Sequence, residues 1–166
     1  MSASACRLAG AAFTAVLAAS FAAPASAQLA HKDLSLDTAV TIATTAAATC
    51  KTQGYRVSVH VVGRNGEVLV SLRGDDASPH TMENSMRKAY TSRTFRIPSG
   101  EMVKRVKENP QLAAVYLTNV IATQGALPIT IGDDVIGAVG VSGAPGGDKD
   151  EACAKTGIDK VADQLK

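Results

Sequence analysis

Apolar residues recur at helical spacing over residues 36–53 and predict the first helix of the chain. Ser35 or Asp37 can accept hydrogen bonds from its first turn, and Gly54 ends the pattern. The buried face of this helix is expected to consist of Leu36, Val40, Ala43, Ala47 and Cys50.

Two β-hairpins are predicted where apolar and polar residues alternate around turn signals. Residues 55–62 carry Tyr or Val at every second position, and Asn65-Gly66, a strong two-residue turn, separates them from a partner strand at 67–72. Residues 127–131 and 135–142 flank a Gly-Asp-Asp turn and predict the second hairpin.

The remaining segments predict helices between and after the hairpins. Helices are expected over residues 81–95, from about 99 to 107, over 110–117 and over 150–165, whereas 118–125 show no clear period. The residues expected to face inward are Met82, Met86, Ala89 and Tyr90 in the second helix, and Cys153, Ile158, Val161, Ala162 and Leu165 in the last. The order α-β-β-α-α-β-β-α indicates an α+β fold, an antiparallel sheet with flanking helices.

The segment from Val135 to Ala154, VIGAVGVSGAPGGDKDEACA, joins a strand to the last helix. Its β-branched residues favour a buried strand, and the Gly- and Pro-rich loop after Ser142 cannot continue it. Asp148 or Asp150 is expected to cap the helix that follows. The loop, which begins at Gly143, can bind an anion through backbone N–H groups beside a helix N-terminus, or serve only as a tight turn.

This segment and a second block upstream resemble the GlcG/HbpS-like family of small heme-binding proteins. The upstream block reads Ala77-Ser78-Pro79-His80-Thr81 and continues through Arg87-Lys88-Ala89-Tyr90-Thr91 to Thr94-Phe95-Arg96. The resemblance covers about residues 34–165. It implies a profilin-like arrangement, non-covalent binding of heme or a related tetrapyrrole, and a homo-oligomer.

The N-terminus has the pattern of a secretory signal peptide. Residues 1–27 combine a short polar start containing Arg7, an apolar run and the small-residue ending Pro24-Ala25-Ser26-Ala27. The pattern predicts a cleaved signal peptide, a single mature domain over 28–166, and a periplasmic or secreted protein. The apolar run is too short and too alanine-rich for a transmembrane anchor, so none is expected.

The overall charge of the chain argues against partners that bind through a strong global electrostatic field. Without Arg7, the 17 basic residues fall to 16, against 15 acidic residues, and no Trp is present. A near-neutral chain with few aromatic side chains does not attract nucleic acid by its global field, so no nucleic-acid partner is expected. The core is expected to be built mainly from Ala, Val, Ile and Leu.

Two cysteines remain after the signal peptide, Cys50 and Cys153. In an oxidising compartment an even number of cysteines indicates a disulfide, which here would join two predicted helices near opposite ends of the domain. The alternative is that both are small buried apolar residues, as free cysteines often are.

His80 is the candidate iron ligand, because it lies in a loop behind Pro79 at the entrance to a helix and imidazole commonly ligates heme iron. The alternative is an ordinary helix-entry residue, with Ser78 or Thr81 forming the cap. His60 on the first strand and His31 in the lead-in are weaker candidates. No Cys-x-x-Cys-His motif occurs, so any heme would be held without a covalent link.

The helix after His80 and the next one are rich in basic residues, which can pair with the propionates of heme or can simply form a solvated face. These residues are Arg87, Lys88, Arg93, Arg96, Lys104, Arg105 and Lys107. Within the family-like block, Thr81, Arg87 and Lys88 are placed nearest the ligand, together with Gly143 of the glycine-rich loop.

Other chemistries have less support in the residues. Met82 and Met86 beside His80 could bind copper, although a Met pair at this spacing is more often core. No metalloprotease, serine-hydrolase or P-loop motif occurs, so no catalytic residue is assigned. Two other functions stay open: a non-catalytic oligomeric accessory protein, and a protein or enzyme that binds small carboxylates.

Overall fold

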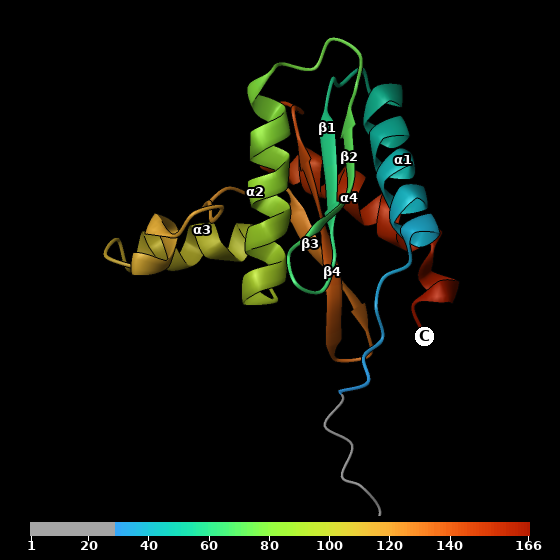
Figure 1. Cartoon of the computed structure of the whole chain (residues 1–166). Coiled ribbons are helices and arrows are strands. Elements are labelled where there is room, and N and C mark those ends of the chain that lie inside the picture. Colours follow the sequence, from blue (N-terminus) through green and yellow to red (C-terminus); the bar gives the residue numbers. More distant parts are fainter. Residues whose placement is uncertain (1–28) are drawn as a thin grey trace, which may run out of the picture. The chain divides into compact units, whose positions relative to one another are not determined.

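A four-stranded antiparallel sheet in the order β2-β1-β4-β3 organises residues 31–166 (Figure 1). The computed structural model describes residues 29–166, and the predicted signal peptide at 1–27 lies outside them. The strands are β1 (Ser58–Val62), β2 (Val68–Arg73), β3 (Ala126–Ile131) and β4 (Asp134–Ser142). Both predicted hairpins are therefore present, and β1 and β4 pair at the centre of the sheet.

The helices cover both faces of this sheet, with α1 and α4 on one face and α2 on the other (Figure 1). Helix α3 leaves the end of α2 and extends away from the sheet. The helices are α1 (Leu36–Thr52), α2 (His80–Phe95), α3 (Ser99–Glu108) and α4 (Gly147–Lys160), with short 3₁₀ turns at Ala113–Tyr116 and Ala162–Gln164. The predicted α+β class is confirmed.

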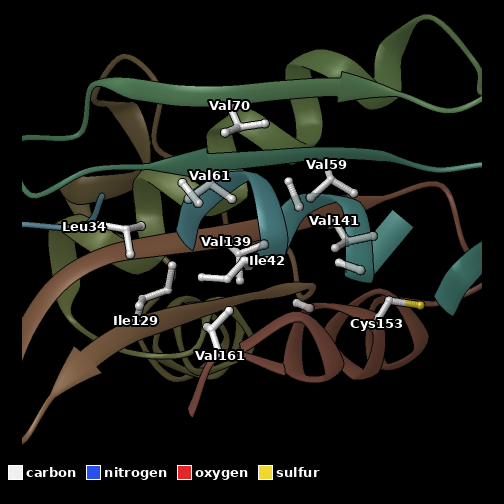
Figure 2. Close-up of a cluster of buried hydrophobic side chains, with 14 of the residues drawn as sticks. Leu34, Ile42, Val59, Val61, Val70, Ile129, Val139, Val141, Cys153 and Val161 are labelled. Atoms are coloured by element: carbon white, nitrogen blue, oxygen red, sulfur yellow. The ribbon is translucent and has the colours of Figure 1, made fainter. Parts of the chain in front are cut away.

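The main core lies between the sheet and the pair α1 and α4. Val59 and Val61 of β1 point into it and meet Ile42 of α1 and Val139 of β4, as Figure 2 shows. The intervening residues of β1 face α2 instead. Because helices cover both faces, all five residues of β1 are buried, which alternation alone did not predict.

Helix α1 is rotated relative to the prediction. Leu36 and Val40, expected in the core, are 59% and 41% exposed. The buried face consists of Thr38, Ala39, Ile42, Ala43, Ala46 and Cys50. Its small alanines allow α1 to lie close against α4, and dense packing of the pair outweighs burial of the larger Leu36.

Helix α2 buries a polar face, contrary to the expectation of an apolar face with Met82, Met86 and Tyr90, all of which are half-buried. Its buried residues are Thr81, Ser85, Lys88, Ala89, Thr91 and Ser92. The reason lies in the sheet below, which presents polar residues of β1 and the backbone of β4. Gly140 brings that backbone so close that a Cβ there would lie 2.7 Å from the backbone N of Ala89.

Two predicted helices have different limits. Helix α4 begins at Gly147 rather than near Asp150, and no side chain caps it, so the expected capping by Asp148 or Asp150 is wrong. The segment at 110–117 forms only the 3₁₀ turn Ala113–Tyr116, with no buried residue. Because none of its apolar side chains is buried against the rest of the domain, a longer helix gains no packing there.

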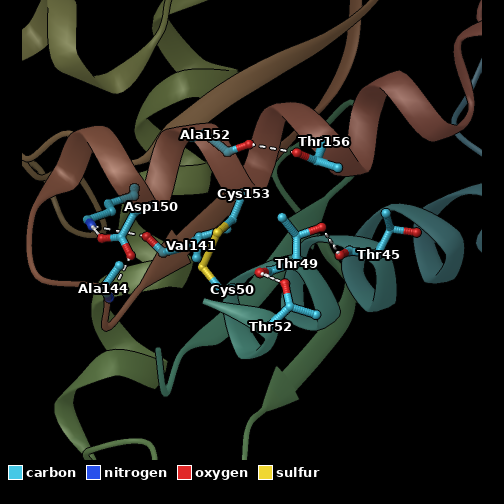
Figure 3. The surroundings of a disulfide bond; sticks show 11 residues. Thr45, Thr49, Cys50, Thr52, Val141, Ala144, Asp150, Ala152, Cys153 and Thr156 are labelled. Carbon is cyan, nitrogen blue, oxygen red and sulfur yellow. Dashed lines mark hydrogen bonds and ion pairs between the residues drawn. A yellow bond between two sulfur atoms is a disulfide. The ribbon is translucent and has the colours of Figure 1, made fainter. Parts of the chain in front are cut away.

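A disulfide joins Cys50 in the last turn of α1 to Cys153 in α4 (Figure 3). The two Cα atoms are 5.7 Å apart, and the cysteines are separated by 103 positions in the sequence. Of the two states considered from the sequence, the structure has the disulfide.

Candidate functional site

A polar pocket of about 260 Å³ lies where the start of α2 faces the turn between β4 and α4. Helix α2 and the loop before it contribute Ser78, His80, Asn84 and Lys88. The β4–α4 turn contributes Gly143 and Gly147. The two blocks that carried the family resemblance are thus adjacent in space.

The floor of this pocket is a buried ion pair. Lys88 Nζ donates to Asp150 Oδ2 at 2.8 Å and to the carbonyl of Val141 at 3.0 Å, and both charged side chains are 4% exposed. The other carboxylate oxygen of Asp150 accepts the N–H of Ala144 at 2.9 Å. Burial raises the pKa of Asp150, and the nearby Lys88 ammonium opposes that rise.

Gly125 makes room for the ion pair. Its φ of +131° suits glycine, and a Cβ at this position would lie 2.7 Å from Lys88 Nζ and 2.8 Å from the Cβ of Asp150. Any larger residue at this position would displace the Lys88 ammonium from Asp150. The segment at 118–125, which had no clear period in the sequence, therefore contributes to the site through its backbone.

A second hollow of about 500 Å³ adjoins the polar pocket and is lined mainly by apolar atoms. Helix α3 contributes Gly100, Val103 and Lys104, and the segment before β3 contributes Ala122 and Thr123. Asn84, Lys88 and Gly147 line both recesses. Together the two form one site with a polar end and an apolar end.

Below α2, a layer of hydrogen bonds joins the helix to the sheet. His60 Nδ1 lies 2.8 Å from Ser85 Oγ, and His60 Nε2 lies 2.8 Å from Ser71 Oγ. The Ser85 hydroxyl also donates to the carbonyl of Met82. Burial lowers the pKa of His60. Both of its ring nitrogens bond to serine hydroxyls, so this histidine is not available as a ligand.

Four of the five residues expected near a ligand line the polar pocket: His80, Thr81, Lys88 and Gly143. The His80 side chain is exposed at the rim, whereas Thr81 is 1% exposed and bonds to Ser58 at 2.7 Å.

Arg87 points elsewhere. It donates to the carbonyl of Val120 at 2.9 Å and pairs with Glu83 at 3.3 Å. The helical period explains this placement, because Arg87 and Lys88 lie about 100° apart around α2.

Sequence reasoning missed three residues of the site. Arg56 lines the polar pocket from the segment before β1, Asn84 donates from Nδ2 to Ser142 Oγ at 2.9 Å, and Asp150 completes the ion pair. Asp150 was considered only as a helix cap, because nothing in one sequence indicates that its partner is Lys88.

A larger hollow of about 530 Å³ lies at the other side of Arg56, between the end of α1 and the loop after β2. Two of its charged residues, Lys51 and Asp75, pair with each other at 3.3 Å and are largely exposed. Size alone therefore does not mark it as the functional site.

Within residues 29–166, no three His, Cys, Asp or Glu side chains gather as a metal site. Over the same range, no helix has the length and apolar character needed to span a bilayer.

The fold and the paired recesses define a small α+β protein with a ligand-sized site beside α2. The family model described as "Haem degrading protein HbpS-like" matches residues 34–159, and the chain belongs to this family.

Solved structures agree with that assignment. The crystal structure of HbpS is 34% identical, with a TM-score of 0.79, and the match covers 84% of this chain and 98% of that chain. Klebsiella pneumoniae protein ORFY is 25% identical, with a TM-score of 0.76 and the same coverage of 84% and 98%. The PduOC:heme complex, at 22% identity and a TM-score of 0.71 over 77% and 94%, shares the fold.

Proposed function

We propose that this protein binds heme, or a related tetrapyrrole, non-covalently in the site formed by the polar pocket and the apolar hollow. The observation that carries the proposal is that the two recesses are contiguous through Asn84, Lys88 and Gly147. Heme has the matching character, an apolar plate with two carboxylates at one edge. Membership of a family described by haem degradation supports the same ligand, as does a heme complex of a protein with this fold.

The residues fit such a ligand in size and chemistry. The apolar hollow of about 500 Å³ is within the range of roughly 300–1,000 Å³ that is usual for small-molecule sites. Val103 and Ala122 offer apolar contacts to a ring, and the polar end offers Lys88 and Arg56. Bound heme would supply a redox-active iron, whose fifth or sixth ligand the protein can provide.

His80 is the proposed iron ligand. Its imidazole is exposed at the rim of the pocket, in contrast to His60, whose ring nitrogens both bond to serines. Sensing, scavenging or storage of heme requires only reversible binding, so no catalytic residue is assigned.

Titration of the mature protein with hemin tests this function. A saturable Soret shift at micromolar hemin is expected, and the band should persist through the titration if the protein binds heme without degrading it. His80→Ala should change the position of the Soret band, whereas His31→Ala, a matched exposed histidine in the lead-in, should not. Absence of a saturable shift in the wild type would refute heme binding. An unchanged spectrum in His80→Ala would refute only the assignment of His80 as the iron ligand.

Export is the second part of the proposal. The signal-peptide pattern at 1–27 and the disulfide between Cys50 and Cys153 both fit an oxidising compartment outside the cytoplasm. Recovery of the protein from the periplasmic or secreted fraction, with an N-terminus at Gln28, is the expected result. A full-length product in the cytoplasmic fraction would contradict it.

The third part of the proposal is that the protein self-associates into a homo-oligomer. Support comes from exposed apolar side chains on and after α3, where Tyr116 is 81% and Leu117 57% exposed. Light scattering at increasing protein concentration should show a mass above that of one chain. If the mass rises but hemin gives no shift, the chain is better described as a non-catalytic oligomeric accessory protein.

A further inference from the structure

The polar pocket is small for a ligand site. Its volume of about 260 Å³ is below the roughly 300–1,000 Å³ of usual small-molecule sites, while the adjoining apolar hollow lies within that range. The polar pocket therefore suits one polar group, either the end of a larger ligand or a very small molecule.

Lys88 offers a hydrogen-bond donor to such a group. An ammonium has three N–H donors, and the described residues accept two of them, the Val141 carbonyl and Asp150 Oδ2. Lys88 is 3% exposed yet lines both recesses, so the third donor has only these recesses in which to find a partner. A buried donor without an acceptor is costly, and a bound group that accepts from it is correspondingly favoured.

The start of α4 offers a second donor. Its N-cap is Gly146, which has no side chain, and no described residue accepts the N–H of Gly147. Gly147 lines the pocket, and the N-terminus of a 14-residue helix favours negative charge.

The charges around the pocket select a monoanion. Asp150 neutralises the charge of Lys88, and each of its oxygens accepts a hydrogen bond, Oδ2 from Lys88 and Oδ1 from the Ala144 N–H. Arg56 at the rim adds one positive charge, while Asp148 outside the pocket is exposed and opposes it weakly. One net positive charge with two separate donors matches the two oxygens of a carboxylate better than a phosphate dianion.

We infer that the polar pocket between α2 and the β4–α4 turn is a carboxylate subsite, in which Lys88 and the Gly147 N–H hold the anion and Arg56 attracts it. The carboxylate has two candidate sources: a propionate of bound heme, which rests on the proposed function, or a free small carboxylate, which does not. In the first case the subsite recognises a propionate at the edge of heme. In the second case it recognises the carboxylate of a free small acid.

The experiment has one arm for each source. In the first, wild-type protein is titrated with hemin and with hemin dimethyl ester, which keeps the ring and lacks the free carboxylates. In the second, its thermal midpoint is measured with propionate, succinate and the neutral propionamide. Three variants accompany both arms: Arg56→Gln at the exposed rim, the charge-balanced double variant Lys88→Met/Asp150→Asn, and Arg105→Gln, a control outside the site.

Hemin should bind about tenfold more tightly than its dimethyl ester, which corresponds to losing one charge-assisted hydrogen bond. Arg56→Gln and the double variant should reduce that preference, and Arg105→Gln should keep it. If the ester binds as well as hemin and no carboxylate raises the thermal midpoint, the subsite is refuted while heme binding stands. If hemin does not bind but propionate or succinate stabilises the protein through Arg56, heme binding is refuted and the subsite stands.

Discussion

Lys88 and Asp150 form an ion pair at 2.8 Å that links the helix on one face of the sheet, α2, to a helix on the other face, α4. One turn further along α4, Cys153 is bonded to Cys50 of α1, as Figure 3 shows. The start of α4 is thus held from both sides, which fixes the glycine-rich turn that borders the polar pocket.

Removing only one member of the ion pair should strongly destabilise the protein. Lys88→Met leaves Asp150 buried without its cation, at an expected cost of about 3–5 kcal/mol in the free energy of unfolding. Lys88→Met/Asp150→Asn removes both charges and keeps an amide oxygen to accept the Ala144 N–H, so it should recover much of that loss. Urea denaturation of both variants, with Asp150→Asn alone to close the cycle, measures the coupling. A double variant no more stable than Lys88→Met would contradict this account.

The disulfide should stabilise the folded protein chiefly by lowering the conformational entropy of the unfolded chain. Closing a loop of about 100 residues is worth on the order of 4–5 kcal/mol in the chain-entropy treatment. The Cys50→Ala/Cys153→Ala variant should therefore have a clearly lower thermal midpoint than the wild type. Adding a reductant should lower the midpoint of the wild type and leave that of the variant unchanged. Equal midpoints for oxidised and reduced wild type would contradict the prediction.

His60 should make stability depend on pH. Burial lowers the pKa of His60 below its ordinary 6.5, and its ring nitrogens meet only the hydroxyls of Ser85 and Ser71. The unfolded chain therefore takes up a proton at higher pH than the folded protein does. This stabilising contribution is complete above pH 6.5 and is lost as the pH falls through the lowered pKa.

Denaturation from about pH 7.5 down to pH 5 measures this effect. The free energy of unfolding should fall more steeply for the wild type than for His60→Gln, which cannot take up that proton. Parallel pH profiles for the two proteins would assign the dependence to other groups.

Local pattern predicted most of the fold, because helices and hairpins are encoded by spacing and by turns such as Asn65-Gly66. It predicted the buried faces less well. Leu36 is exposed and Ser85 is buried, since those outcomes depend on which residues of another element lie opposite. The polar face of α2 is explained only once His60 of β1 is known to lie beneath it.

The candidate site was likewise predicted only in part, because some of its residues stand out in the sequence and others act through long-range contacts. His80, Lys88 and Gly143 stood out through residue type and family-like blocks, and they do line one pocket. Arg56 and Asp150 did not, because their role comes from long-range contacts, with Asp150 lying 62 positions from its partner Lys88.

Gly140→Ala should separate α2 from the sheet. A Cβ at Gly140 would lie 2.7 Å from the backbone N of Ala89 and 3.0 Å from its Cβ, and a helix backbone cannot yield as a side chain can. Overpacking of this kind costs about 1–3 kcal/mol.

Gly100→Ala in α3 is the matched control, because the nearest atoms belong to the flexible side chain of Gln124, at 3.1 Å, and Ala is preferred over Gly inside helices by about 1 kcal/mol. Thermal unfolding should show a loss for Gly140→Ala and none for Gly100→Ala. Since α2 carries Lys88 and His80, hemin affinity should fall in the same Gly140→Ala protein even where it remains folded. A Gly140→Ala variant as stable as the wild type would mean that α2 does not lie as close to β4 as its contacts with Ala89 indicate.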